Sequence, residues 1–433
     1  MEIGLARRLK FTRLIAITAG TPLASSVFLS IILVCLTAGT ALNLIVGVLL
    51  ATLLVILVSF SYGELVSIYP SAAGNRVFLR KPLGNNAALS LSLMWVFIIL
   101  GAAGVESFMV GNVLHFLFGA LPAMYWAMVV LTVILVINIL GVEISGNFQL
   151  LITFFVIISL VGIFSYSLIF VRPVYVNVPT GFNVVQSMTA ATIAVYFYLG
   201  FGRVTTLGEE AIDYKRGIPR AMPVALALVA LTFVLGSLAI FDHVPSAVLS
   251  TTYIPQIILG NYVLRGTPIT LFIAIVSIVM SFGAFNAGIL GASRLIYALG
   301  REGTFPRIFG NVHTRFHSPY VSLIFLYLVV LGVVFYVFST KNYSIPILVA
   351  AGFDSFMYSL ISYSAFWHNR HMDHSEIPFY IKHGGVIFII LSVAFAILGI
   401  LLLLTSPPVV SLLIIFGTLA IYIFYLLRFR MMR

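Results

Sequence analysis

Long apolar runs with almost no charged residue limit this chain to one class of fold. A helix that crosses a membrane needs about 20 consecutive apolar residues. The 433 residues are 61% hydrophobic and 8% charged, whereas roughly 25% of the residues in a soluble domain are charged. A soluble fold would lack the polar groups to cover its surface. The chain is therefore expected to be an integral membrane protein.

The apolar runs predict twelve membrane-spanning helices. They are continuous and lack the alternation in segments of about ten residues that a membrane β-barrel requires. Helices satisfy their own backbone hydrogen bonds in lipid, so the spans are expected to be helical. The expected spans are residues 11–38, 42–68, 87–118, 123–141, 147–171, 187–211, 222–243, 268–299, 320–339, 344–366, 383–405 and 408–428.

The distribution of Lys and Arg predicts the orientation, because cytoplasmic loops carry an excess of these residues. Of the 23 Lys and Arg residues, only Arg172, Arg265 and Lys341 fall in loops on the poorer side. Both termini are therefore expected in the cytoplasm, with an even number of spans. The net charge of +11 follows from this bias and requires no nucleic-acid partner. The first span lacks a small-residue cleavage site and is expected to be retained.

One basic residue, Arg203, and three acidic residues, Glu64, Glu106 and Asp354, are expected near membrane depth, whereas Glu209 and Glu210 come at the end of their span. A charge at the bilayer centre costs several kcal/mol unless it is paired or faces water. Glu64 lies near the cytoplasmic end of its span and is expected to reach water. Arg203, Glu106 and Asp354 are functional candidates that could line a wet central cavity. The alternative is that Arg203 pairs with Glu106 or Asp354 and only holds helices together.

The cysteine and histidine patterns predict no metal site. The single cysteine, Cys35, excludes an intramolecular disulfide and a cysteine-based metal site. His368, His371 and His374 recur every three residues, which makes a metal site conceivable. Their loop is polar, however, and exposed histidines are the expected outcome.

Two of the expected spans are interrupted. The first contains AGTPLASSVFL (19–29), where Pro22 removes a backbone donor. The sixth contains YFYLGFGRVTTLGEE (196–210), with Gly200 and Gly202 in its middle. Paired interruptions at corresponding positions of two halves indicate a transporter site. Free N–H groups there suit a carboxylate, and free carbonyls suit an ammonium or a cation. The alternative is that both interruptions are kinks that serve packing.

Four stretches, in the right order, carry a resemblance to a known family. They are AGTPLASSVFL, SYGELVSIYPSAAGNRVFLRKPLG (61–84), YFYLGFGRVTTLGEEAIDYKRGIPRAM (196–222) and FNAGILGASRLIYALGREGTFPRIF (285–309). Together they make the chain similar to the amino acid–polyamine–organocation transporter family from about residue 11 to 370. The resemblance implies an all-α membrane protein of twelve helices, with a five-plus-five inverted-repeat (LeuT-like) fold and discontinuous helices 1 and 6. The implied units are a transport core (1–366, with repeats 11–171 and 187–366) and two additional helices (383–428).

The same resemblance implies a function and its partners. It implies secondary active transport of amino acids across the plasma membrane by alternating access, coupled to H⁺ or Na⁺ and without a cofactor. The protein would be a monomer or a homodimer in the lipid bilayer. Alternatives of the same fold are a polyamine or organocation transporter, an amino acid/amine exchanger and a non-transporting sensor. A membrane-embedded enzyme would need clustered His, Asp or Glu at membrane depth, and only scattered charges are present.

By position, the resemblance also implies a substrate site. The amides of Ser25 and Ser26 would hold a substrate carboxylate, and carbonyls near Pro22 and in the sixth span would hold its amine. The chain departs from the family motif at Ala24 and Ser26, where the family has glycines. The implied substrate-binding set is Thr21, Pro22, Ala24, Ser25, Ser26, Tyr196, Phe197, Leu199, Gly200 and Phe201.

The coupling groups are less directly implied. Some proton-coupled members carry a lysine in the fifth span, where this chain has Val156. Glu106 or Asp354 is then expected to carry the coupling proton, and a sodium site near Ser281 is the alternative. Arg203 could bind an anionic substrate group, form a gate pair with Asp354 or Glu106, or neutralise an acid. The gate pair is favoured, because a fixed cation in the site would repel a substrate amine.

Overall fold

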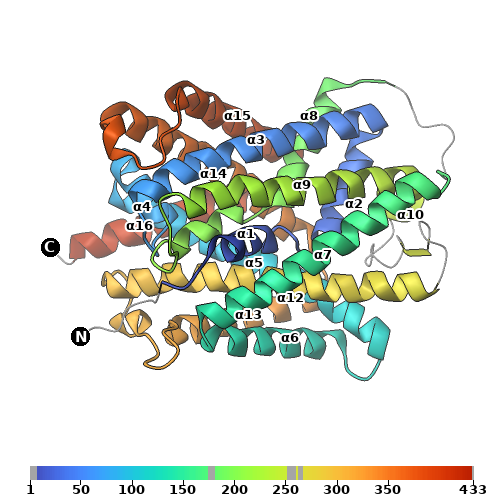
Figure 1. The fold of residues 1–433 in the computed structure, drawn as a ribbon, viewed down its shortest axis with the longest axis horizontal. Coiled ribbons are helices and arrows are strands. Elements are labelled where there is room, and N and C mark those ends of the chain that lie inside the picture. The colour runs from blue at the N-terminus through green and yellow to red at the C-terminus, as the bar shows by residue number, and fades with distance from the viewer. Residues whose placement is uncertain (1–6, 174–180, 251–259, 262–266, 432–433) are drawn as a thin grey trace.

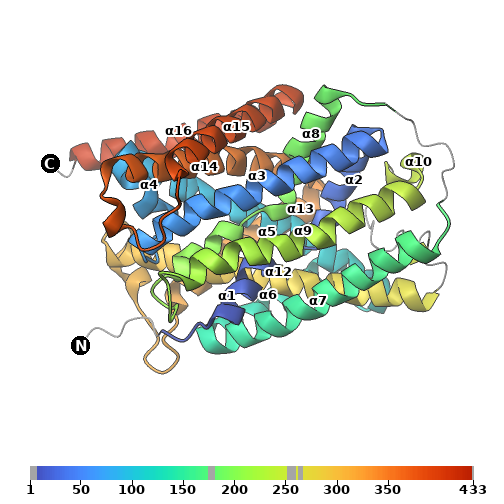
Figure 2. The ribbon, with the colours of Figure 1, turned by 45° about the horizontal axis from the view of Figure 1, so that its top comes forward.

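The computed structural model describes residues 7–173, 181–250, 260–261 and 267–431, and this part of the chain is built of helices. Figures 1 and 2 show most of the long helices running side by side along the longest axis of the molecule. The expected all-α architecture is confirmed. The elements are α1 (Phe11–Gly20), α2 (Val27–Ala38), α3 (Ala41–Ile68), α4 (Asn75–Leu83), α5 (Asn85–Phe118), α6 (Ala123–Ile139), α7 (Val142–Phe170), α8 (Val184–Ala194), η1 (Val195–Tyr198), η2 (Phe201–Leu207), α9 (Gly217–His243), α10 (Ser246–Leu249), α12 (Thr267–Arg301), η3 (Arg307–Gly310), α13 (Tyr320–Thr340), α14 (Ser344–His371), η4 (His374–Glu376), α15 (Gly384–Thr405) and α16 (Pro408–Met431).

Nine helices in the described residues are long and apolar enough to cross a membrane. They are α3, α5, α7, the stretch Val184–Leu207, α9, α12, α13, α14 and α15, and the shorter apolar helices are α1, α2, α6 and α16. The chain is therefore a multi-pass membrane protein. The count of twelve spans and the division into repeats 11–171 and 187–366 stay predictions.

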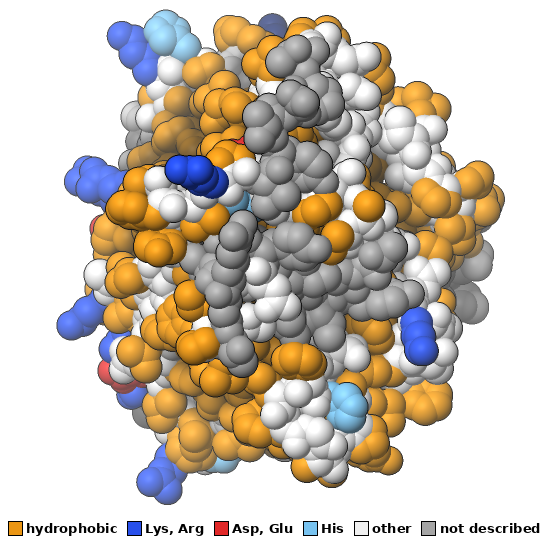
Figure 3. All heavy atoms as spheres, turned by 90° about the vertical axis from the view of Figure 1, so that its right-hand side faces the viewer, with side chains coloured by type: hydrophobic (Ala, Val, Ile, Leu, Met, Phe, Trp, Pro, Cys, Tyr) orange, Lys and Arg blue, Asp and Glu red, His pale blue; other side chains and the backbone are white. Residues whose placement is uncertain are grey.

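The outer surface is suited to lipid. Large apolar side chains on the outer helices are well exposed, among them Leu151 at 74% and Leu404 at 77%. Figure 3 views the end of the molecule opposite the termini, where hydrophobic side chains cover much of the described surface and Lys and Arg are scattered. Exposed apolar side chains along the outer helices would drive aggregation in water, whereas in a bilayer they face hydrocarbon; Figure 3 shows an end of the helix bundle and not these sides.

Local chemistry explains several helix ends. Gly39 ends α2 with φ +65°, a conformation that glycine adopts without strain. The Thr40 hydroxyl then accepts a hydrogen bond from the Asn43 backbone N–H at 3.2 Å and starts α3. The Asn183 side chain caps α8 in the same way, through the Gln186 N–H at 3.1 Å.

Both expected interruptions are confirmed. The first span ends as α1 at Gly20 and resumes as α2 at Val27, with Thr21–Ser26 between them. The second changes from α8 to the 3-10 turns η1 and η2, which are separated by Leu199 and Gly200. Gly200 has φ +80°. The two breaks are neighbours, because α1 packs against η2 and α2 packs against η1.

The first described residues and the end of α16 lie at the same end of the molecule (left in Figure 1). Here the N-terminal segment pairs with the chain after η2. The backbone N–H groups of Arg8 and Leu9 donate to the Glu210 carbonyl at 2.9 and 3.0 Å, and the Ile212 N–H donates to the Leu9 carbonyl at 3.1 Å. The cytoplasmic location of this end stays a prediction.

The expectation that Glu64 reaches water is wrong. Glu64 has no exposed surface. Its carboxylate accepts hydrogen bonds from the Asn369 side chain at 3.1 Å and from the Ile381 backbone N–H at 3.2 Å. The end of α14 and the segment after it cover this carboxylate, and the sequence gives no local sign of that cover.

Candidate substrate site between two helix breaks

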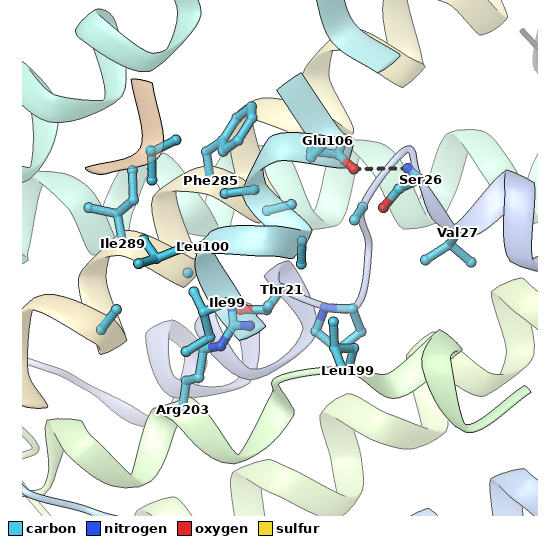
Figure 4. A pocket seen from close by; sticks show the side chains of 18 of the residues that line it. Thr21, Ser26, Val27, Ile99, Leu100, Glu106, Leu199, Arg203, Phe285 and Ile289 are labelled. Atoms are coloured by element: carbon cyan, nitrogen blue, oxygen red, sulfur yellow. Dashed lines mark hydrogen bonds between the residues drawn. The ribbon is translucent and has the colours of Figure 1, made fainter. Parts of the chain in front are cut away.

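A cavity lies between the two helix breaks (Figure 4). Its volume is about 50 Å³, well below the ~300 Å³ of a typical small-molecule pocket, so this conformation leaves room only for a small occupant. The remaining walls come from α5, α12 and α13, with Val27 at the start of α2. The first break contributes Thr21, Pro22, Ala24 and Ser26, and the second contributes Tyr196, Leu199 and Arg203.

Glu106 of α5 binds the backbone of the first break. Its Oε1 accepts the Ser25 backbone N–H at 2.8 Å and the Ser25 hydroxyl at 2.6 Å. Its Oε2 accepts the Ser26 backbone N–H at 2.9 Å (Figure 4). The Ser281 hydroxyl of α12 also donates to Oε1. Glu106 is 3% exposed, so four donors from the protein compensate for its burial.

The start of α2 explains why a carboxylate binds here. The first N–H groups of a helix have no partner within the helix, and the helix dipole places positive charge at this end. The sequence resemblance assigned the amides of Ser25 and Ser26 to a substrate carboxylate. In this structure the Glu106 carboxylate occupies both amides.

Ser281 belongs to the same cluster. Its hydroxyl lies 2.8 Å from the Ser25 hydroxyl and donates to Glu106, so the oxygen expected to bind sodium is engaged by a carboxylate and a second serine. Within the described ranges, no group of three or more His, Cys, Asp or Glu side chains is arranged to hold a metal ion. This holds for His368, His371 and His374 as well. A sodium site near Ser281 stays a prediction.

Arg203 extends from η2 into the cavity (Figure 4), and three glycines lie beside its side chain. A Cβ atom at Gly200 would lie 2.7 Å from its guanidinium carbon, and one at Gly288 would lie 2.8 Å from Nη1. A Cβ at Gly291 would lie 2.8 Å from the Arg203 Cβ. Arg203 is 5% exposed, and its guanidinium lies 5.9 Å from the centre of the Trp95 ring. These glycines make room for a buried arginine.

Arg203 and Asp354, the expected gate pair, do not form a salt bridge in the described part of the structure. Asp354 is 1% exposed, and its Oδ2 accepts the Tyr358 hydroxyl at 3.4 Å. Arg203 is close enough to interact electrostatically with Asp354, but none of the salt bridges among the described residues joins them. Within this part of the chain, Arg203 Nε and Asp354 Oδ1 have no hydrogen-bond partner. The gate pair stays a prediction.

The expected aromatic residues divide into two groups. Tyr196 lines the cavity, and its hydroxyl lies 3.5 Å from the Ser26 hydroxyl. Phe197 instead packs on Phe233, with ring centres 5.4 Å apart. Phe201 packs between Tyr62 and Tyr358, with ring centres 5.3 and 5.4 Å away. Phe197 and Phe201 are therefore placed behind the cavity lining, as are Ser25 and Gly200.

A buried amide network beside the first break was not anticipated. The Asn138 amide donates to Asn286 at 3.0 Å, the Asn286 amide donates to Gln149 at 2.9 Å, and Ser145 donates to Asn286 at 2.8 Å. All four side chains are fully buried. A side chain at Gly20 would collide with the Gln149 amide. These residues lie on α6, α7 and α12, and single polar residues in apolar helices give no signal of a shared network.

The amino-acid sequence is similar to those of known membrane transporters. The family model described as amino acid permease matches residues 14–431. An uncharacterized transporter of Mycobacterium tuberculosis is 26% identical over 323 residues, which cover 73% of this chain and 71% of the relative. The human cystine/glutamate transporter is 24% identical over 351 residues (75% and 67%). The low-affinity putrescine importer of Escherichia coli is 24% identical over 290 residues (63% and 63%).

The family match covers nearly the whole chain, including both breaks and the cavity between them. It supports membrane transport of amino acids or related organocations. The chain belongs to the amino acid permease family, within the amino acid–polyamine–organocation superfamily.

Proposed function

We propose that the protein is a secondary active transporter that moves amino acids or related organic amines across the plasma membrane by alternating access. The cavity between the two helix breaks would be its substrate site, and the termini would lie in the cytoplasm. The observation that carries this proposal is the meeting of both breaks at one cavity that also holds Glu106 and Arg203.

The physical reason is the state of the backbone at the breaks. Irregular backbone at membrane depth is tolerated where it is covered by protein or lines a cavity. Transporters with discontinuous helices use such breaks to present N–H groups and carbonyls to a ligand. The named relatives include one for cystine and glutamate and one for putrescine, so both amino acids and amines are reasonable first probes.

Coupling to an ion gradient belongs to the same proposal. Glu106 and Asp354 are buried carboxyl groups at or behind the cavity, and either could take up a proton. Sodium near Ser281 is the alternative, and the engagement of that hydroxyl by Glu106 makes the proton our first choice.

Uptake into proteoliposomes tests the proposal. The purified protein would be reconstituted and offered radiolabelled amino acids and amines under an imposed pH gradient, an imposed Na⁺ gradient or neither. We expect at least one compound to accumulate above its external concentration under one gradient, and not in protein-free liposomes. If no compound is bound by the purified protein or accumulated under any gradient, the proposal is wrong.

A further inference from the structure

We infer that Glu106 supplies, from within the protein, the carboxylate that an amino-acid substrate would otherwise place on the amides of Ser25 and Ser26. The transported solute is then a small organic amine without a free α-carboxylate. This inference rests on the proposed transport function and specifies its substrate class.

The first reason is that the carboxylate position is already filled. Both amides at the start of α2 donate to Glu106, one to each of its oxygens, at 2.8 and 2.9 Å. The hydroxyls of Ser25 and Ser281 complete the set. A substrate carboxylate could bind these amides only by expelling Glu106, which would leave a buried charge without its four donors. Such a site rejects a second carboxylate by repulsion and by loss of hydrogen bonds.

The second reason is the charge balance. Glu106 and Arg203 are the acidic and basic residues of the described cavity lining, and Asp354 lies close to Arg203 behind it. All three are at most 5% exposed. With both carboxylates ionised, the group carries one net negative charge. A single ammonium group neutralises it, whereas a zwitterionic amino acid leaves it unchanged. Buried charges are stable when they are compensated.

The third reason is that Glu106 retains capacity for one more donor. Each carboxylate oxygen offers about two acceptor positions. Oε1 accepts from Ser25 twice and from Ser281, while Oε2 accepts only the Ser26 N–H among the described residues. Glu106 and Tyr196 both line the cavity. An ammonium group that donates to Oε2 would therefore bind the same carboxylate that accepts the N–H groups at the start of α2.

Matched pairs of compounds test the inference in the wild-type protein. Each pair is a monoamine and the neutral amino acid that carries the same side chain: phenethylamine with phenylalanine, and isoamylamine with leucine. We expect at least one amine to be taken up by proteoliposomes at least tenfold better than its amino acid. If every transported amino acid equals or exceeds its amine, Glu106 must leave the amides during transport and the inference is overturned.

Substitution of Glu106 sharpens the test. Glu106→Ala removes the internal carboxylate. Amine uptake is therefore expected to fall at least tenfold, and uptake of the paired amino acid is expected to rise. Acetate should restore part of the amine binding to the purified variant by occupying the vacated amides. Loss of amine uptake without any gain by the amino acid or rescue by acetate would contradict the assigned role. Should Glu106→Ala fail to fold, Glu106→Gln keeps the shape and removes the charge. It should weaken amine uptake at least tenfold, and unchanged amine uptake would overturn the inference.

The matched control is Ser107→Ala. Ser107 follows Glu106 on α5, is fully buried, and donates only to the Ala103 carbonyl of its own helix, at 2.7 Å. Its removal should leave the amine-to-amino-acid ratio unchanged. The transport function and the role of Glu106 can be refuted separately. Failure of every probe to bind or accumulate overturns the transport function, whereas transport that prefers amino acids leaves the function standing and overturns the role of Glu106.

Discussion

Glu210 and Arg294 form an ion pair that has no exposure to solvent. Arg294 Nε and Nη2 donate to the two Glu210 oxygens at 2.9 and 3.0 Å. The pair joins the chain after η2 to α12, and the Glu210 carbonyl also accepts the backbone of Arg8 and Leu9. One buried pair thus connects the N-terminal segment, the second helix break and α12.

Glu210→Gln is expected to destabilise the protein strongly, because it leaves the Arg294 guanidinium buried and unpaired. Removal of one partner from a buried ion pair costs about 3–5 kcal/mol, which should appear as a clear fall in the apparent Tm in detergent. Glu143→Gln is the control, because its pairs with Arg8 and Arg13 are partly exposed and such pairs contribute roughly 0–1 kcal/mol. Equal Tm shifts for the two variants would contradict this account.

Gly200→Ala is expected to abolish transport. Gly200 has φ +80°, and an added Cβ would lie 2.7 Å from the Arg203 guanidinium. The left-handed conformation costs an L-residue roughly 1–2 kcal/mol, and the clash adds to this cost. Either effect would reshape the second break. The measurement is uptake of the best substrate at matched protein content. Gly162→Ala is the control, since nothing lies within 4 Å of its added Cβ and its φ is ordinary, and it should retain wild-type uptake. Wild-type uptake by Gly200→Ala would show that the break geometry is not needed.

Arg203 and Asp354 are expected to depend on each other despite the lack of a closed ion pair. Arg203→Ala should leave Asp354 without its nearby cation, and Asp354→Ala should leave Arg203 without its nearby anion. The double variant should therefore lose less stability than the sum of the single variants, by about 0.5–3 kcal/mol. A double-mutant cycle on the apparent Tm measures this coupling. Additive losses would mean that the two residues act independently.

Glu209 predicts an acid-dependent loss of stability. Burial alone would raise the pKa of the Glu209 carboxyl, but hydrogen bonds from the Arg301 guanidinium and the Ala72 backbone N–H outweigh it and hold the pKa below its usual value of 4.5. The unfolded chain therefore binds the proton first as the pH falls. The stabilisation is complete above the usual pKa and is lost as the pH drops through the lower pKa of the folded protein.

The corresponding measurement is the apparent Tm of the wild type and of Glu209→Gln between pH 3 and 7. We expect the difference between the two proteins to be largest near neutral pH and to shrink below about pH 4.5. A difference that does not change with pH would mean that the charge of Glu209 contributes nothing to the contact between the 69–74 loop and α12.

The breaks could be predicted from the sequence because their causes are local. Pro22 cannot donate a hydrogen bond, and Gly200 adopts a conformation that other residues avoid. The partners of Glu106 could not be predicted in the same way. Ser25 and Ser281 lie 81 and 175 residues from it in the chain, and only packing of α5 and α12 beside the first break brings them together. The sequence marked Glu106 as costly to bury, but it did not identify which groups compensate for that burial.

Two other observations have the same origin. Glu64 was expected in water because it lies near the end of a span, yet α14 and the segment at Ile381 cover it. The family resemblance assigned Phe197 and Phe201 to the substrate site, and that assignment stays a prediction. In this conformation Phe197 of η1 packs on Phe233, and Phe201 of η2 packs on Tyr358. Position along the chain predicts which region forms the site, and only tertiary packing decides which side chains face it.

An experimental structure with a bound substrate tests the central claim most directly. The ligand would be the best-transported compound of the uptake panel, and the map would be compared with one obtained without it. We expect ligand density between the two breaks, next to Tyr196 and Glu106, with Glu106 still bound to the amides of Ser25 and Ser26. Density elsewhere, such as the apolar groove between α5, α13 and α16 at Phe97, Phe325 and Ile421, would contradict the site, and a ligand carboxylate on those two amides would contradict the role of Glu106.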